Sequence, residues 1–408
     1  MKKTNACSKS NELNSVLSSH FQAKINLARI KLISHFIIAL CKVQTVTFEK
    51  LANAFETSVD SKSSLRRIQR FIANYSLDGD LIARLIFSLL PKQEGLILSI
   101  DRTNWKFGQA NINIFMLGIV YKGVAFPLLF TMLDKRGNSN SQERIDLVNR
   151  FIRLFGKDVI TSIVADREFV GNRWLGFLNR NGIKYYIRIR NNFKIELPSK
   201  NKTIKAWHLF NAYKVNEFVF YPKIVRVNGQ LCYLSGCKLS PKKGKPDFLI
   251  IVSFNAPNKA LEQYKDRWQI EMCFKAMKSS GFDIQNTHLK DIERIQKLVL
   301  LVMVAFVWCY KVGIYLNLIN PIKIKKHGRM AKSIFKHGLD YIASVLLNPL
   351  NQNNINLLKS ASYSKSPIGF YFFEKKYETI IILGCLSNQL TQLPLPTYKA
   401  VERKPVYP

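Results

Sequence analysis

Apolar side chains in the first ninety residues recur at the three- and four-residue spacing of helices that face a core. Residues 25–41 form one such stretch, and residues 48–55 and 64–72 form two short helical patterns on either side of a turn rich in Ser and Asp. This pair predicts a helix-turn-helix unit. Its second helix carries three arginines that suit contact with DNA phosphates or a DNA groove: Arg66, Arg67 and Arg70. Short basic helices also occur on ordinary domains, so this DNA contact is a hypothesis.

From residue 95 the pattern changes to short apolar runs, typical of buried strands, that alternate with amphipathic helical stretches. Lys122-Gly123 separates two of the runs and predicts a tight hairpin turn. Three strands in hairpin order, then strands alternating with helices, predict a mixed α/β sheet similar to that of ribonuclease H. The expected strands are residues 96–100, 112–121, 124–132, 161–165 and 183–190, and the expected helices are residues 141–155 and 171–181.

Residues 192–254 break this alternation and predict a β-rich insertion. Apolar runs at 218–227 and 231–239 flank an Asn228-Gly229 turn, and another run follows at 247–254. Helical spacing returns near residue 258. Further helices, from about residue 291 to 347, are expected to close the core.

Two of the expected strands end in an aspartate, Asp101 and Asp166. Neighbouring strand ends in one sheet can bring such side chains together, and two close carboxylates need a shared proton or a cation. Since no His or Cys cluster accompanies them, oxygen ligation favours Mg²⁺ or Mn²⁺. Aspartates after strands also cap turns. We interpret Asp134, which precedes a turn, as structural, and Glu168 as lying outside the strand end.

Tyr264, Arg267, Glu271 and Lys278 fall on one narrow stripe if residues 264–278 form a single helix, since each residue turns the helix by about 100°. A charged helix face is usually a solvated surface. A lone carboxylate beside a guanidinium, an ammonium and a phenol, however, suits a site that holds metal ions and phosphates. Together with the two aspartates, the stripe predicts Glu271 as a third metal ligand.

The chain has 408 residues, with 62 Lys and Arg against 27 Asp and Glu, a net charge of +35. Basic residues spread over nearly the whole length favour a nucleic-acid partner over a mere solubility charge or an acidic membrane. The apolar run at 298–310 has 13 residues, fewer than the roughly 20 that cross a bilayer, and predicts a buried core helix. Seven cysteines without a Cys-x-x-Cys pair predict reduced, packed thiols. The polar N-terminal stretch predicts a cytoplasmic location without membrane association.

These motifs resemble those of the DDE transposases of bacterial insertion sequences, specifically the insertion-sequence-four branch. The branch carries Tyr, two residues, Arg, three residues, Glu, six residues and Lys, which residues 264–278 match without a gap. Residues 100–105 (Ile-Asp-Arg-Thr-Asn-Trp) resemble the first-aspartate motif. Residues 165–169 (Ala-Asp-Arg-Glu-Phe), with Trp174, resemble the second. The similarity covers about residues 95–345.

The resemblance implies a ribonuclease H-like catalytic domain at residues 91–345, with its β-rich insertion at about 192–254. Residues 1–90 would form a helical DNA-binding domain, and residues 346–408 a C-terminal tail of unknown role. Asp101, Asp166 and Glu271 would hold two Mg²⁺ or Mn²⁺ ions that cut the transposon end and expose a 3′ hydroxyl, which attacks target DNA. The residues expected to grip the DNA phosphates are Tyr264, Arg267 and Lys278.

The implied partner is double-stranded DNA, as terminal inverted repeats and as target, bound by a homodimer. Related enzymes pass through a DNA hairpin and stack a flipped base on an aromatic residue of the insertion. No motif selects among the candidates Trp207, Tyr233 and Phe248. The alternatives to an active transposase are a catalytically inactive DNA-binding protein and a metal-dependent nuclease without strand transfer.

Overall fold

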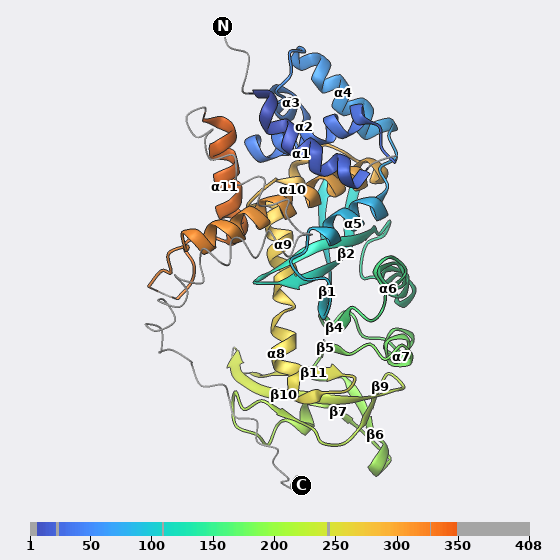
Figure 1. Cartoon of the computed structure of the whole chain (residues 1–408). Helices are drawn as coiled ribbons and strands as arrows, with labels where there is room; N and C mark the ends of the chain where they lie inside the picture. Colours follow the sequence, from blue (N-terminus) through green and yellow to red (C-terminus); the bar gives the residue numbers. More distant parts are fainter. Residues whose placement is uncertain (1–5, 22–23, 108–109, 243–244, 327, 349–408) are drawn as a thin grey trace.

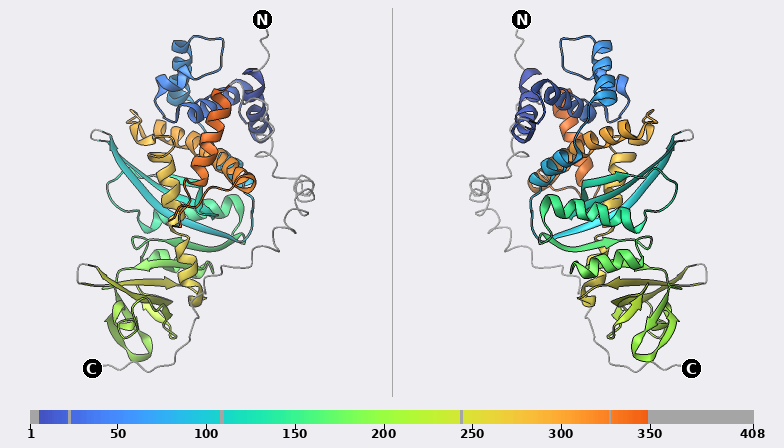
Figure 2. Two further views of the ribbon diagram at one scale, coloured as in Figure 1. Left: turned by 90° about the vertical axis from the view of Figure 1, so that its left-hand side faces the viewer. Right: turned by 90° about the vertical axis from the view of Figure 1, so that its right-hand side faces the viewer.

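The computed structural model describes residues 6–21, 24–107, 110–242, 245–326 and 328–348. Helices from both halves of the chain gather at one end, the central strands lie in the middle, and the β-rich insertion lies at the other end (Figures 1 and 2). The expected C-terminal tail lies outside the described residues from residue 349 onward.

The N-terminal part is helical, as expected. Its second helix is apolar on most of its surface and packs against the C-terminal helices, so the two ends of the described chain share one hydrophobic core. The fourth helix buries Ile68 and Phe71, while Arg66 and Arg70 lie on its exposed side. The five helices are α1 (Ala6–Phe21), α2 (Leu27–Val43), α3 (Phe48–Asn53), α4 (Ser61–Asn74) and α5 (Gly79–Ser88).

A mixed sheet forms the centre, which confirms the mixed α/β class. Strands β1, β2 and β3 pair antiparallel, and β4 and β5 join β1 in parallel. Lys122 and Gly123 turn the β2–β3 hairpin with positive φ angles of 45° and 90°, as Lys-Gly predicts. The elements are β1 (Leu96–Phe107), β2 (Ala110–Tyr121), β3 (Val124–Met132), β4 (Ile160–Ala165), β5 (Tyr185–Ile189), α6 (Ser141–Phe155) and α7 (Asn172–Arg180).

The β-rich insertion extends the central sheet instead of standing apart from it. Its last strand pairs antiparallel with β5, so the strand order is β3-β2-β1-β4-β5-β11-β10-β9-β6-β7, with β8 beside β10. Two short strands before residue 206 were not expected, and the run at 218–227 divides into two strands. The strands are β6 (Lys194–Leu197), β7 (Lys202–Lys205), β8 (Val219–Phe220), β9 (Val225–Val227), β10 (Gln230–Lys242) and β11 (Lys245–Ser253).

Four helices follow the insertion: α8 (Ala260–Lys265), α9 (Trp268–Lys278), α10 (Ile292–Ile319) and α11 (Ile334–Leu347). The run at 298–310 lies in α10 and is buried in the core, as predicted. The helix itself has 28 residues, and in length and composition it alone among the described helices could cross a membrane, a property that buried core helices share. Backbones of α10 and α11 touch at Gly313 and Gly338, where a Cβ atom would strike the opposite helix.

Candidate active site

Asp101 and Asp166 take adjacent positions on neighbouring parallel strands. The last pair in the β1–β4 ladder is Ile100 with Ala165, and each aspartate is the next residue. The expectation that β1 ends at Asp101 was wrong, because β1 continues to Phe107 by pairing with β2. Asp101 therefore lies in mid-strand, where backbone pairing on the β2 side holds it, and Asp166 follows directly after β4.

Helices α8 and α9 cover the sheet face that carries these aspartates, and Figure 1 draws α6 and α7 on the other side of the strands. Side chains alternate along a strand, so Ser99 shares a face with Asp101, and Ser162 with Asp166. The Ser99 hydroxyl donates to the carbonyl of Arg267 (Oγ–O 3.4 Å). The Ser162 hydroxyl donates to Gln263 (Oγ–Oε1 2.9 Å). These small polar residues let the helices approach the strands closely.

The residues of the expected stripe do not lie on one continuous helix. α8 ends at Lys265 and α9 begins at Trp268, with the amide of Arg267 bonded to the carbonyl of Tyr264 three residues back (3.1 Å). The prediction of a single helix was wrong at this joint, where tighter three-residue bonds replace the usual four-residue ones. The stripe is also not a solvated surface, since only 6% of Tyr264 and 6% of Arg267 is exposed.

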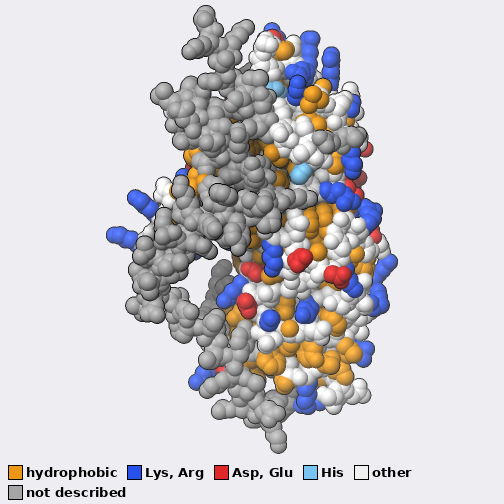
Figure 3. All heavy atoms as spheres, in the orientation of Figure 1, with side chains coloured by type: hydrophobic (Ala, Val, Ile, Leu, Met, Phe, Trp, Pro, Cys, Tyr) orange, Lys and Arg blue, Asp and Glu red, His pale blue; other side chains and the backbone are white. Residues whose placement is uncertain are grey.

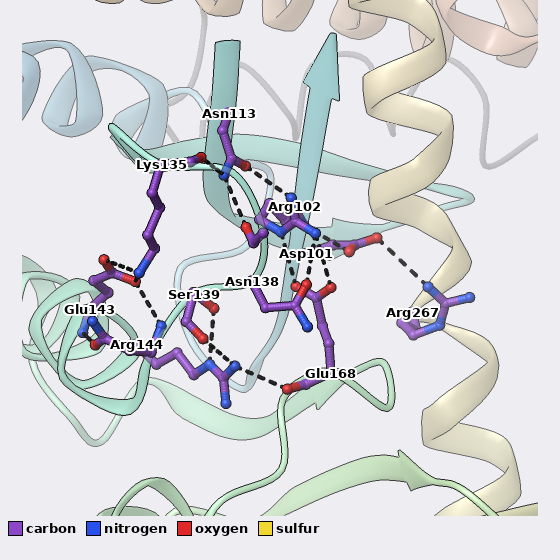
Figure 4. A network of polar contacts seen from close by, with 12 residues as sticks. Asp101, Arg102, Asn113, Lys135, Asn138, Ser139, Glu143, Arg144, Glu168 and Arg267 are labelled. Atoms are coloured by element: carbon purple, nitrogen blue, oxygen red, sulfur yellow. Dashed lines mark hydrogen bonds and ion pairs between the residues drawn. The ribbon is translucent and has the colours of Figure 1, made fainter. Parts of the chain in front are cut away.

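Arg267 lies between two of the predicted catalytic carboxylates. Its Nη1 atom is 2.7 Å from Glu271 Oε1 and 3.7 Å from Asp101 Oδ2. Figure 4 shows the guanidinium reaching from the helix toward Asp101 on β1. The side chain of Arg267 is 7% exposed, and its Nε atom is buried without a hydrogen-bond partner among the described residues. The Asp101 carboxylate from β1 and the Glu271 carboxylate from α9 thus both lie near the Arg267 guanidinium.

Burial dominates the electrostatics of Asp101. It raises the pKa of this carboxyl to about 7, with Glu168 and Glu271 adding to the rise, while the Arg102 amide and Arg267 oppose it. The Arg102 amide lies 2.7 Å from Asp101 Oδ1. The Arg102 amide and the Arg267 guanidinium therefore offset only part of the cost of burying this carboxyl.

Arg267 itself remains charged. Burial works against its charge, but Tyr264, Glu271 and Asp166 outweigh burial and raise the pKa of the guanidinium. Asp166 thus acts on the same guanidinium as the other two carboxylates. Two of the three carboxylates predicted from the sequence, Asp101 and Glu271, therefore lie against Arg267, and Asp166 acts on it through charge.

The other two residues of the stripe also turn toward the sheet. Tyr264 packs against Val164, Tyr186 and Ile251, and burial raises the pKa of its hydroxyl. The Lys278 ammonium donates to the main-chain carbonyl of Asn104 on β1 (3.0 Å) and lies over the Trp105 ring. The motif therefore fastens α8 and α9 to the strands around Asp101. Its contact with DNA stays a prediction.

A second polar network lies beside Asp101 and was missed in the sequence. Arg102 donates through Nε and Nη2 to the two oxygens of Glu168 (3.3 and 3.4 Å) and through Nη2 to Asn138 (2.9 Å), as Figure 4 shows. The Arg144 guanidinium donates to the carbonyl of Glu168 (2.9 Å). Glu168 lies outside the strand end, as expected, yet it bonds to the neighbour of Asp101. The position of Glu168, two residues after Asp166, was the sequence signal that could have indicated a role beside Asp101.

The donor chemistry around Asp101 suits hard cations, because carboxylate oxygens are the ligands that Mg²⁺ and Mn²⁺ prefer. Across the described parts of the chain, no group of three or more His, Cys, Asp or Glu side chains is arranged as a finished metal centre. Arg267 stands between Asp101 and Glu271 instead. The carboxylate oxygens are of the kind that bind these ions. In this structure, the positive charge next to Asp101 and Glu271 is the Arg267 guanidinium.

The remaining candidates lie away from this cluster. Arg66, Arg67 and Arg70 belong to α4 at the helical end of the molecule (Figure 1). In the insertion, Trp207 stacks on His208 (ring centroids 3.8 Å apart) and lies 6.0 Å from the ring of Phe248, which is buried. Tyr233 is half-buried on β10. The geometry selects none of the three aromatic residues for a flipped base.

Five cysteines have a described environment in the structure. Cys41, Cys232, Cys237, Cys273 and Cys309 are buried and free, as packed thiols should be. On the face of the molecule in Figure 3, Lys and Arg side chains are widely spread, while Asp and Glu gather mainly near the middle. Acidic groups framed by basic ones suit a site that holds cations beside a polyanion.

The mixed sheet thus places Asp101 and Asp166 at neighbouring strands, and the Arg267 guanidinium joins Asp101 to Glu271 on α9. Residues 92–308 match the model of the transposase DDE domain, and the chain belongs to this family. No curated protein matches the sequence. The family confirms the prediction of a transposase, with DNA as its substrate and DNA transposition and recombination as its activity.

Proposed function

We propose that the chain is an active transposase of the insertion-sequence-four branch, built on a ribonuclease H-like core. It binds the ends of an insertion sequence, cleaves them and joins their 3′ ends to target DNA. The observation that carries this proposal is the adjacency of Asp101 and Asp166 directly after the last pair of the β1–β4 ladder, with Glu271 bonded to the same Arg267 guanidinium that faces Asp101. The complete tyrosine-to-lysine motif at residues 264–278 supports the branch assignment.

In this proposal Asp101, Asp166 and Glu271 hold two Mg²⁺ or Mn²⁺ ions. When bound, these ions supply the positive charge that activates a water or hydroxyl and stabilises the leaving oxygen. The backbone pairing of β1 orients Asp101, and Arg102 with Glu168 fixes the loop that follows Asp166. Tyr264, Arg267 and Lys278 position DNA phosphates.

The surroundings of the site fit double-stranded DNA. The net charge of +35 favours contacts with many phosphates. We assign residues 1–90 to binding of the terminal inverted repeats, through exposed α4 arginines such as Arg66 and Arg70. Two copies of the chain would act on a pair of ends in the cytoplasm. The aromatic residue that receives a flipped base stays unassigned.

The test is an assay of end cleavage and joining with the purified chain. A labelled duplex carrying the terminal inverted repeat is incubated with Mg²⁺ and a target plasmid, and products are resolved on a denaturing gel. We expect a cut at the repeat end and a joined product, both abolished by Asp101→Ala. Binding without cutting would identify an inactive DNA-binding protein, and cutting without joined product would identify a nuclease.

A further inference from the structure

Arg267 bridges two carboxylates that come from distant parts of the chain. A single nitrogen, Nη1, contacts Glu271 in the first turn of α9 at 2.7 Å and faces Asp101 on β1 at 3.7 Å. The link between helix and strand is therefore ionic at the point where the proposed chemistry takes place. Two carboxylates held this close would repel each other without a positive group between them.

The surroundings hold the guanidinium in this place. Its side chain is 7% exposed, the carbonyl of its own residue accepts the Ser99 hydroxyl, and its planar end lies 4.9 Å from the centre of the Trp268 ring. Nε has no hydrogen-bond partner among the described residues. A buried guanidinium that lacks a partner at one nitrogen depends on its carboxylates for stabilisation.

A divalent cation bound by the same oxygens would come close to this guanidinium. An ion that shared oxygens of Asp101 and Glu271 would lie close to Nη1, because this atom contacts Glu271 and faces Asp101. Like charges at such short separation repel strongly in a partly buried site. Arg267 and the ion therefore compete for the same oxygens.

We propose that Arg267 is the internal counter-ion of the metal-free site, and that it leaves Asp101 and Glu271 when a divalent cation binds. This inference rests on the proposed function, since it assumes that these carboxylates are metal ligands. The released guanidinium becomes available to a DNA phosphate. DNA that draws Arg267 away should in turn raise the affinity for the cation, because coupling between two bound species is reciprocal.

The proposal is tested by measuring Mn²⁺ binding to the full chain without DNA, by titration calorimetry or by the paramagnetic signal of free Mn²⁺. Arg267→Gln removes the competing charge and keeps a polar, though shorter, side chain. We expect it to bind Mn²⁺ about tenfold more tightly than the wild type, within the usual range of coupling between sites. Equal or weaker binding by Arg267→Gln would overturn the proposal.

A matched control separates competition from a general loss of charge. Lys278→Gln also removes one positive charge from α9, but Lys278 bonds to the Asn104 carbonyl and not to a carboxylate. We expect it to change Mn²⁺ affinity less than about twofold, because its ammonium bonds to a main-chain carbonyl and does not compete for the carboxylate oxygens. An equal gain from both variants would contradict a specific role for Arg267.

Two further variants distinguish a failure of the proposed function from a failure of the counter-ion role. Asp101→Asn should abolish high-affinity Mn²⁺ binding; if it leaves binding unchanged, the ligand assignment itself fails and the proposed function with it. Loss of binding in Asp101→Asn without a gain in Arg267→Gln would overturn only the counter-ion role. If circular dichroism shows Arg267→Gln unfolded, Arg267→Met replaces it, because it also removes the competing charge and suits a buried position; affinity above the wild type is the expected result and unchanged affinity is the contrary one.

Discussion

The Ser99 hydroxyl on β1 hydrogen-bonds to the main-chain carbonyl of Arg267 at the joint between α8 and α9 (Oγ–O 3.4 Å). Ser99 is fully buried and lies two residues before Asp101 on the same face of the strand. The bond sets the distance between the strand with the first aspartate and the helices with the arginine and the glutamate. A small residue is required there because larger side chains would separate the two layers.

Enlarging Ser99 should therefore disturb both the fold and the site. Ser99→Val adds volume to a closed contact and should lower the free energy of unfolding by about 1–3 kcal/mol. Ser99→Ala loses only the hydrogen bond, worth about 1 kcal/mol. Thermal unfolding and end-cleavage rates should both rank the wild type first, Ser99→Ala second and Ser99→Val last. A Val variant as stable and active as the Ala variant would show that the contact is not close.

Tyr264 contributes through packing as well as through its hydroxyl. Since it is 6% exposed among Val164, Tyr186 and Ile251, Tyr264→Ala should cost about 3–5 kcal/mol of unfolding free energy. Tyr264→Phe keeps the packing and should lower cleavage by only about tenfold. Denaturant unfolding and cleavage assays measure the two effects separately. If Tyr264→Phe and Lys278→Ala abolish cleavage as fully as Glu271→Gln, the division between chemistry and DNA positioning is wrong.

The hydrogen bonds of the Arg102 guanidinium to Glu168 and Asn138 should position the loop after β4. Arg102→Lys cannot reach both oxygens of Glu168 and Asn138 at once, because an ammonium lacks the planar fork. We expect cleavage to fall by about ten- to a hundredfold, with faster amide hydrogen exchange in residues 166–170. Exchange can be followed by mass spectrometry. Slower cleavage with unchanged exchange would contradict a positioning role.

Lys311 offers a pH test of the core. Burial lowers its pKa to about 8, so between pH 8 and 10 the unfolded chain binds more protons than the folded one. This group should therefore make the protein more stable as pH rises through that window, relative to Lys311→Met. At pH 7 the Met variant should be more stable by about 3 kcal/mol. Parallel melting curves at pH 7 and 10 measure the difference, and a constant gap between the two proteins would contradict the lowered pKa.

Sequence reasoning captured the elements that local chemistry defines. Lys122-Gly123 supports a positive-φ turn, and the strand before Asp166 is a clear apolar run. The extension of β1 past Asp101 was missed because residues 102–107 are mostly polar and owe their strand form to pairing with β2. The pairing of β11 with β5 joins residues about 60 apart and has no local signal.

In the candidate site, too, local motifs were predictable and long-range contacts were not. Asp101, Asp166 and Glu271 stood out through their motifs, whereas the joint at Arg267 did not, since every residue from 260 to 278 is compatible with a helix. Burial of Tyr264 against the sheet and the bond from Ser99 produce that joint, and both are tertiary contacts. The ion pair of Arg102 with Glu168 likewise depends on two strands meeting.

The most direct test of the three-carboxylate site compares end cleavage by Asp101→Asn, Asp166→Asn and Glu271→Gln with that by the control Glu168→Gln. DNA affinity is measured in parallel with Ca²⁺ in place of Mg²⁺. Each of the three variants should bind DNA within about threefold of the wild type yet cleave at least about a thousandfold more slowly, because such residues act as one unit. The control should keep cleavage within about tenfold, since the amide oxygen of the substituted side chain would still accept a bond from Arg102. Near-normal cleavage by any one of the three carboxylate variants would contradict the account.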